Sequence, residues 1–171
     1  MRFEVSPQLI AEFYAEGAVS IDELLSLEGI TEGSFESRRD RFAKDPDFKK
    51  RFFGSGISHI AAALTKAPAL QIGSDQLYLE GELPETFTLY EITSLSKIAC
   101  GMLVEPEKPV HFVSPELEIE RPEGPVLICC WITPGCRYAP RGGDPLSHLL
   151  RRAGYNAGDV LVSKTHPIVK K

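Results

Sequence analysis

The segment Val126–Ile132 restricts the possible folds most strongly, because every one of its residues is apolar. Successive side chains of a strand point to opposite faces of a sheet, so a strand that is apolar throughout is buried on both faces. Thr133-Pro134-Gly135 follows directly and ends the run with residues typical of turns. The segment therefore predicts a central strand that is covered on both sides.

Shorter apolar or alternating runs accompany this strand and predict a sheet of several strands. Gly, Pro, Ser or charged residues bound these runs, as is typical of short strands. A short helix is expected over Leu146–Ala153, where Asp144-Pro145 precedes it and Gly154 ends it. The other expected strands cover residues 77–79, 87–93, 98–104, 110–113, 117–119, 158–162 and 164–169.

The first part of the chain has helical patterns instead. Ser6-Pro7 predicts a helix start, and Ser20–Glu23 matches a capping box that predicts a helix ended by Gly29. The chain is therefore expected to be α+β, with a helical lobe over residues 1–67 and a β-rich core over 68–171 in one structural domain. Further helices are expected over residues 35–43, after Asp45-Pro46, and from Ile57 to Ala67.

Composition excludes several functional classes. The formal net charge of −5 argues against a general nucleic-acid binder. No apolar run approaches the roughly 18 residues of a membrane span, and Met1–Pro7 has no apolar signal region. A soluble protein is expected, either cytoplasmic or delivered without a cleaved signal peptide. The sequence does not indicate an oligomeric state.

The residue types that usually hold metals or act as nucleophiles are dispersed. The four cysteines form no CxxC pair, so buried reduced thiols and no metal site are expected. The four histidines are scattered, although folding could still bring a Cys–His pair together. These residues are Cys100, Cys129, Cys130, Cys136, His59, His111, His148 and His166.

Basic and acidic residues alternate densely between Arg38 and Arg51. Mixed charges at this density predict a solvated helix face with ion pairs between neighbouring turns. The alternative is a docking surface for an acidic partner.

Several short segments in the last two-thirds of the chain have a recognisable order and spacing. They resemble the corresponding part of mono-ADP-ribosyltransferases, from about Ile57 to Val169. The matching segments are Ala61–Pro68, Leu89–Ile92, His111–Ser114, Ile132–Gly135 and Gly158–Val162.

The resemblance implies a split β-sandwich that binds NAD, with the functional residues near its cleft. Asp159 takes the place of the catalytic carboxylate, which would stabilise the positive charge that develops when nicotinamide leaves. Tyr90 and Ser114 would line the NAD site, and Arg137 or Arg141 would replace the missing NAD clamp. Two positions depart from the family, because Glu91 stands where an arginine is usual and Ala157 where an acidic residue is usual.

Three functions remain open from the sequence. The first is a divergent ADP-ribosyltransferase that modifies a protein target, and effectors and toxins are common in that family. The second is a catalytically inactive protein-binding module of the same fold, and the third is an unrelated α+β interaction protein. The first two require Tyr90, Ser114 and Asp159 to meet in one crevice.

Overall fold

The computed structural model describes residues 3–29 and 32–170, and its elements confirm an α+β chain. Met1 and Arg2, part of the segment used to assess a signal peptide, lie outside the described residues. The helices are α1 (Pro7–Glu16), the 3-10 helix η1 (Arg41–Ala43), α2 (Pro46–Phe53), α3 (Ser55–Thr65), α4 (Leu89–Ile92) and α5 (His148–Arg152). The strands are β1 (Ala18–Ile21), β2 (Leu70–Tyr78), β3 (Thr86–Phe87), β4 (Ile98–Val104), β5 (Val110–Val113), β6 (Ile119–Glu120), β7 (Val126–Ile132) and β8 (Ile168–Lys170).

Six strands form an antiparallel sheet in the order β1-β5-β4-β7-β2-β8. β7 lies between β4 and β2, and all its residues are buried, which confirms the central strand expected from Val126–Ile132. β3 and β6 pair with each other in a separate two-stranded sheet. The helices and the small sheet pack against this six-stranded sheet.

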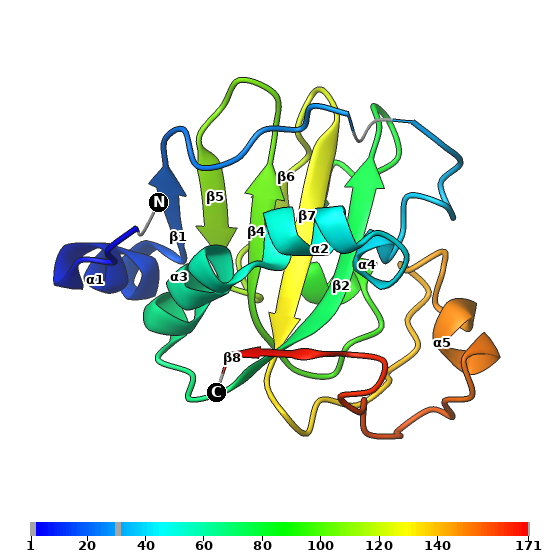
Figure 1. Cartoon of the computed structure of the whole chain (residues 1–171). Coiled ribbons are helices and arrows are strands. Elements are labelled where there is room, and N and C mark those ends of the chain that lie inside the picture. Colours follow the sequence, from blue (N-terminus) through cyan, green and yellow to red (C-terminus); the bar gives the residue numbers. More distant parts are fainter. Residues whose placement is uncertain (1–2, 30–31, 171) are drawn as a thin grey trace.

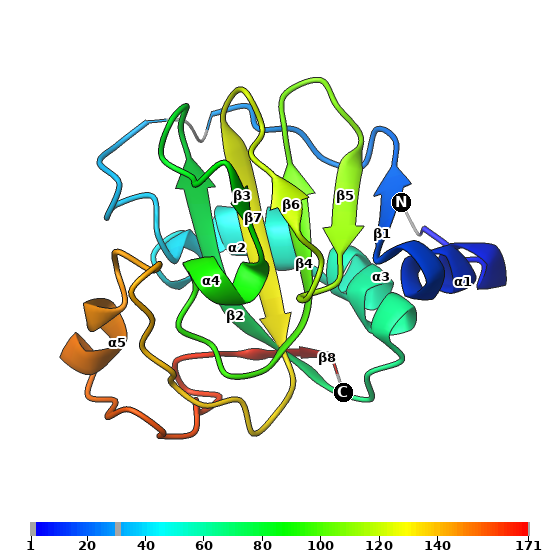
Figure 2. The same ribbon diagram turned by 180° about the vertical axis from the view of Figure 1, so that it is seen from behind.

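Each face of the large sheet is covered by a different layer. Helices α2 and α3 cover one face (Figure 1), and α4, β3 and β6 lie over the other (Figure 2). The outer cluster, beneath α2 and α3, includes Phe53, Leu64 and Trp131. The inner cluster, between the two sheets, is also apolar and is formed by Tyr78, Leu83, Phe87, Leu89, Ile92, Leu95, Ile98, Leu103, Val113, Val126, Ile128, Cys130, Ile132, Cys136, Tyr138, Tyr155 and Leu161.

The N-terminal third is only partly helical. The Ser6 side chain accepts a hydrogen bond from Leu9 N at 3.2 Å and caps α1, as its sequence predicts. The helix expected after Ser20 is wrong, because Ser20 and Ile21 belong to β1, which pairs with β5 from Ala18↔Val113 to Ile21↔Val110. Burial of Val19 and Ile21 outweighs the local capping signal.

Two further expectations about local structure are wrong. Residues 87–93 were expected to form a strand, but they form the end of β3 and then helix α4, which Thr88 caps by accepting a hydrogen bond from Glu91 N. Residues 158–162 contain no strand, and Val160 only makes an isolated bridge with Arg137. A short alternating run does not distinguish a strand from a loop that alternates in exposure.

The basic stretch between Arg38 and Arg51 is a solvated helix face only in α2, where Asp47 and Lys50 are exposed. Its first part is buried instead. Arg38 is 3% exposed and makes two hydrogen bonds of 2.9 Å to the Glu82 carboxylate. Arg39 is 6% exposed and makes two hydrogen bonds of 3.1 Å to the Asp144 carboxylate. These ion pairs connect the segment to residues more than forty positions away, which a local charge pattern cannot indicate.

Among the described residues, no helix is long and apolar enough to cross a lipid bilayer.

Candidate functional site

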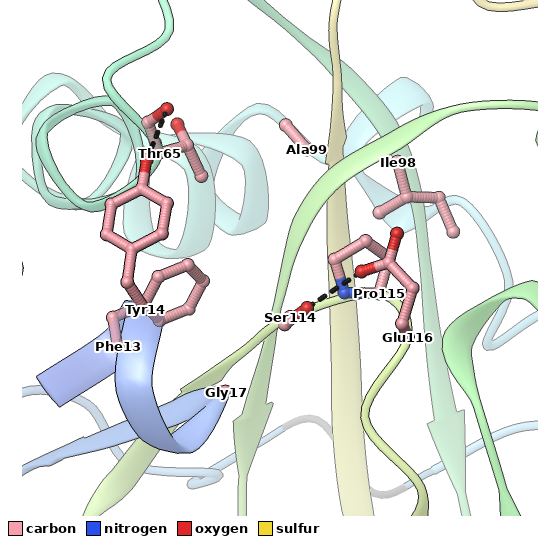
Figure 3. Close-up of a pocket in the computed structure, with 9 residues that line it drawn as sticks. All are labelled: Phe13, Tyr14, Gly17, Thr65, Ile98, Ala99, Ser114, Pro115 and Glu116. Carbon is pink, nitrogen blue, oxygen red and sulfur yellow. Dashed lines mark hydrogen bonds between the residues drawn. The ribbon is translucent and has the colours of Figure 1, made fainter.

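Ser114 lines a cavity of about 360 Å³ between α1, the end of α3 and the beginning of β4 (Figure 3). Its hydroxyl donates to Glu116 Oε2 at 2.8 Å, and across the cavity Tyr14 OH donates to Thr65 O at 3.2 Å. Glu116 is the single charged residue in the lining of this cavity. With its polar groups already paired, the Ser114 cavity offers little that would select a ligand.

Tyr90, Ser114 and Asp159 do not meet in this cavity, because neither Tyr90 nor Asp159 lines it. The Tyr90 hydroxyl accepts a hydrogen bond from Ile98 N at 3.1 Å. Asp159 Oδ2 accepts from Asn156 N at 2.7 Å and closes a turn near the C-terminus. Tyr90 and Asp159 therefore hold backbone groups in place.

Arg137 and Arg141 also bind backbone carbonyls. Arg137 Nη1 donates to Gly158 O at 2.8 Å, and Arg141 Nη1 donates to Leu95 O at 2.7 Å and Thr93 O at 3.2 Å. Arg141 also lies over the Tyr90 ring at 5.4 Å from its centroid. Both guanidinium groups brace the polar loop between β7 and α5 against its neighbours.

A larger cavity of about 450 Å³ lies beyond the β8 edge of the sheet, and we call it the arm cavity. One wall comes from η1 and α2, the second from α5, and the third from the C-terminal arm, residues 155–167. In Figure 1, α5 and the C-terminal arm lie at the right and lower right of the molecule, and α2 lies nearer its centre. The apolar surface of the arm cavity is formed by Phe42, Ala43, Leu149, Leu150, Ala153 and Pro167.

The polar side of the arm cavity contains a chain of hydrogen bonds. Val162 N donates to Tyr155 OH at 3.2 Å, and Tyr155 OH is in close contact with Thr165 Oγ1. Thr165 Oγ1 lies 2.8 Å from His166 Nδ1. Lys49 and Lys164 also line the cavity, so two cations adjoin this chain.

Burial lowers the pKa of His166 to about 4, from about 6.5 in a solvated chain. The folded protein therefore binds fewer protons than the unfolded chain between pH 6.5 and 4, and His166 destabilises the fold progressively as the pH falls through this window. Burial raises the pKa of Asp75 to about 7, with a further contribution from Asp40, and this has the opposite effect on stability in the same window. The two contributions oppose each other in the parent protein.

We expect His166→Gln to remove the acid-dependent loss due to this imidazole. Between pH 7 and pH 4, the free energy of unfolding of the parent should fall by about 3 kcal/mol relative to that of the variant. Urea unfolding at several pH values measures this difference. His148→Gln, at an exposed position of α5, is the matched control. Parallel pH profiles for the parent and His166→Gln would show that His166 is not buried as a neutral group.

Metal-ligand residue types do not converge among the residues that the structure describes. They contain no group of three or more His, Cys, Asp or Glu placed to hold a metal ion. The residues outside the described ranges are Met1, Arg2, Ile30, Thr31 and Lys171, and none of them is of these types. All four cysteines are buried and free, as expected from the sequence.

No protein-family model matches this sequence, and no curated protein sequence matches it. Solved structures do share its architecture. SnoK, a non-heme α-ketoglutarate-dependent carbocyclase from nogalamycin biosynthesis, aligns with a TM-score of 0.71 over 98% of this chain and 97% of its own, at 14% identity. The chain has a fold similar to that of SnoK.

Two other solved proteins have the same fold at comparably low identity. SnoN, a non-heme α-ketoglutarate-dependent epimerase from the same biosynthesis, aligns with a TM-score of 0.64 over 95% of this chain and 98% of its own, at 12% identity. CT296 from Chlamydia trachomatis aligns with a TM-score of 0.53 over 78% of this chain and 98% of its own, at 16% identity. SnoN has also been solved in complex with Fe3+, α-ketoglutarate and nogalamycin RO.

These structures correct the resemblance to mono-ADP-ribosyltransferases, which is wrong. NAD binding, ADP-ribose transfer and the effector, toxin or pseudoenzyme roles were expected from that family and are withdrawn with it. The matching segments are too short to identify a fold: Ala61–Pro68 includes the end of α3, Leu89–Ile92 is helix α4, and His111–Ser114 and Ile132–Gly135 include strand ends. One of them, residues 158–162, is not a strand at all.

Tyr155, Thr165 and His166 were not selected from the sequence as a group. Thr165 and His166 were read as part of a strand, and Tyr155 was not singled out. The adjacency of a hydroxyl residue and a histidine before Pro167 was the available signal. This signal indicates a site only in the folded chain, where Tyr155 lies beside Thr165.

Proposed function

We propose that this protein is a metal-independent binding protein with a cupin-like double-stranded β-helix fold, and that its ligand site is the arm cavity. The observation that carries the proposal is the filling of the space between the two sheets. The interior of a small β-barrel or sandwich can hold either side chains or a ligand. Here a cluster of seventeen buried apolar or aromatic residues and cysteines packs on the inner side of the large sheet and extends to Tyr155 and Leu161 of the C-terminal arm.

The residues present do not fit an iron centre. Non-heme iron that activates oxygen with α-ketoglutarate is usually held by two histidines and one carboxylate. His59 and His148 are exposed on α3 and α5, His111 bonds Ser20 Oγ at 2.8 Å, and His166 bonds Thr165. These four side chains lie on different elements, so we derive no reaction step through iron or α-ketoglutarate.

The arm cavity has the properties of a small-molecule site. Its volume of about 450 Å³ lies within the usual range of roughly 300 to 1,000 Å³ for such sites. Apolar walls and a few convergent polar groups are also typical. The Ser114 cavity is smaller and its hydroxyl is already paired, so it is the weaker candidate.

Blocking each cavity in turn tests the proposal. Ala153→Trp fills the arm cavity, and Ala99→Trp fills the Ser114 cavity as a matched control. Small-molecule fragments of mixed charge are screened for a rise in Tm of the parent, since a ligand of the folded state stabilises it. We expect the Tm response to fragments that bind the parent to persist in Ala99→Trp and to disappear in Ala153→Trp.

Two outcomes would contradict the proposal. Fragments whose binding is lost in Ala99→Trp and kept in Ala153→Trp would move the site to the Ser114 cavity. A rise in Tm on anaerobic addition of Fe(II) together with α-ketoglutarate, absent with either alone, would show that the chain assembles a metal centre after all.

A further inference from the structure

In the hydrogen-bond chain of the arm cavity, Val162 N can only donate, so Tyr155 OH accepts from it. Either hydroxyl could donate in the contact between Tyr155 and Thr165, and we assign Tyr155 as the donor because its phenol is the more acidic group. The Thr165 hydroxyl then has two possible acceptors, His166 Nδ1 at 2.8 Å and Val162 O at 3.3 Å. The shorter contact favours His166 Nδ1 as the acceptor.

This direction fixes the tautomer of His166. A neutral imidazole that accepts at Nδ1 carries its proton on Nε2. Within residues 3–29 and 32–170, no protein group forms a hydrogen bond with Nε2. The His166 residue is 4% exposed and lines the arm cavity. Its Nε2 is therefore a polar atom at the cavity for which the described residues supply no hydrogen-bond partner.

The charges around the cavity favour an anion as that partner. Lys49 and Lys164 both line it, and Asp40 is the one acidic residue in the lining. Asp40 Oδ1 lies 3.6 Å from Arg39 Nε, but Arg39 already pairs with Asp144, so the two lysines exceed the acidic residue of the lining by one charge. Two ammonium groups and one N–H donor are then available to the same ligand.

The apolar residues of the lining add a second requirement. Leu149 and Leu150 of α5 and Phe42 of η1 give the cavity apolar surface beside its charged groups. A ligand that fills about 450 Å³ and satisfies both sides has an anionic head and a short hydrocarbon body. A free inorganic ion would leave the apolar wall in contact with water.

We propose that the arm cavity binds a small amphiphilic anion, a carboxylate or a phosphate ester, whose head accepts a hydrogen bond from His166 Nε2 and pairs with Lys49 and Lys164. This inference rests on the proposed function, because it names the ligand class of the same cavity. Carboxylate and phosphate share the chemistry that the site recognises, and they differ in charge and in the number of acceptor oxygens.

Matched probes that differ only in the head group test the inference by isothermal titration calorimetry. Hexanoate and hexyl phosphate carry the anionic head, hexanamide is the neutral analogue, and inorganic phosphate lacks the hydrocarbon body. We expect one of the two amphiphilic anions to bind at least tenfold more tightly than hexanamide and inorganic phosphate. The tighter of the two identifies the head group.

Substitutions in the cavity locate the binding. Lys49→Gln combined with Lys164→Gln should weaken binding of the better anion roughly tenfold or more. Lys97→Gln, an exposed position outside the cavity, should leave binding unchanged. His166→Leu removes the Nε2–H donor and should also weaken binding, whereas His166→Gln retains an N–H donor and should weaken it less. Circular dichroism of each variant checks that the fold is kept.

The results separate this inference from the function on which it rests. Equal binding of hexanamide and hexanoate, lost in Ala153→Trp, would overturn the anion inference and leave the arm cavity as a ligand site. Binding of hexanoate that the two lysine substitutions do not weaken would also overturn it. Failure of all four probes to bind the parent would overturn the anion inference as well. Fragments that bind the parent and fail to bind only Ala153→Trp would still support the proposed function.

Discussion

Replacing Asp144 by Asn is expected to lower the free energy of unfolding by about 3 to 5 kcal/mol. Asp144 is 3% exposed, and its carboxylate accepts two hydrogen bonds from Arg39 and one of 2.7 Å from Ser94 Oγ. Arg39 cannot lose its proton, so the variant leaves a buried cation without its bidentate partner. Asp40, at 3.6 Å from Nε, is too distant to replace those two bonds. Unfolding by urea, which is uncharged and does not screen the ion pair, measures the decrease in the free energy of unfolding.

A second variant separates the buried charge from other effects of the substitution. Arg39→Met combined with Asp144→Leu removes both charges and should recover most of the loss, because apolar replacements of a buried ion pair are often neutral or stabilising. Glu36→Gln breaks the exposed pair with Arg152, 3.1 Å long, and should cost no more than about 1 kcal/mol. A double variant as unstable as Asp144→Asn would show that geometry at residue 144, and not charge, is decisive.

Replacing Trp131 by Ala is expected to lower the free energy of unfolding by about 3 to 5 kcal/mol. Trp131 is fully buried near the end of β7, and its ring packs against Phe53 and Phe112 with centroid distances of 5.2 and 6.1 Å. Its Nε1 donates to Ser58 Oγ at 3.1 Å. The substitution removes these contacts and leaves a cavity between the sheet and helix α3.

The substitution Trp131→Phe isolates one part of this effect. It keeps an aromatic ring and loses the hydrogen bond to Ser58, so an intermediate loss in urea unfolding is expected. Val162→Ala, at a position 50% exposed, is the surface control and should change stability by about 0.5 kcal/mol or less. A loss at Trp131→Ala no larger than that at Val162→Ala would mean that β7 is not the centre of the core.

Strong local patterns in the sequence predicted much of the fold. The all-apolar run Val126–Ile132 is the central strand β7, and the proline after Ser6 and the stripe from Ile57 to Leu64 mark α1 and α3. In each case burial and local propensity favour the same structure. At Ser20–Glu23 they differ, and the pairing of β1 with β5 prevails over the capping box.

The candidate site was not predictable in the same way. Tyr90, Ser114 and Asp159 were selected because of motifs only a few residues long, and each of their side chains instead holds a local hydrogen bond. The arm cavity depends on Lys49, Tyr155 and His166, which come from α2 and the C-terminal arm. No spacing in the sequence relates these three residues.

The sequence by itself determined the elements with the strongest apolar patterns, such as β7, α1 and α3, because apolar periodicity acts through neighbours along the chain. The tertiary structure alone decided that Arg39 is buried with Asp144, that one apolar cluster gathers residues from Tyr78 to Leu161, and that His166 lines a cavity together with two lysines. Those outcomes depend on contacts between residues that are distant in the sequence. The energies of these contacts exceed local conformational preferences, and the contacts produce no periodic pattern in the sequence.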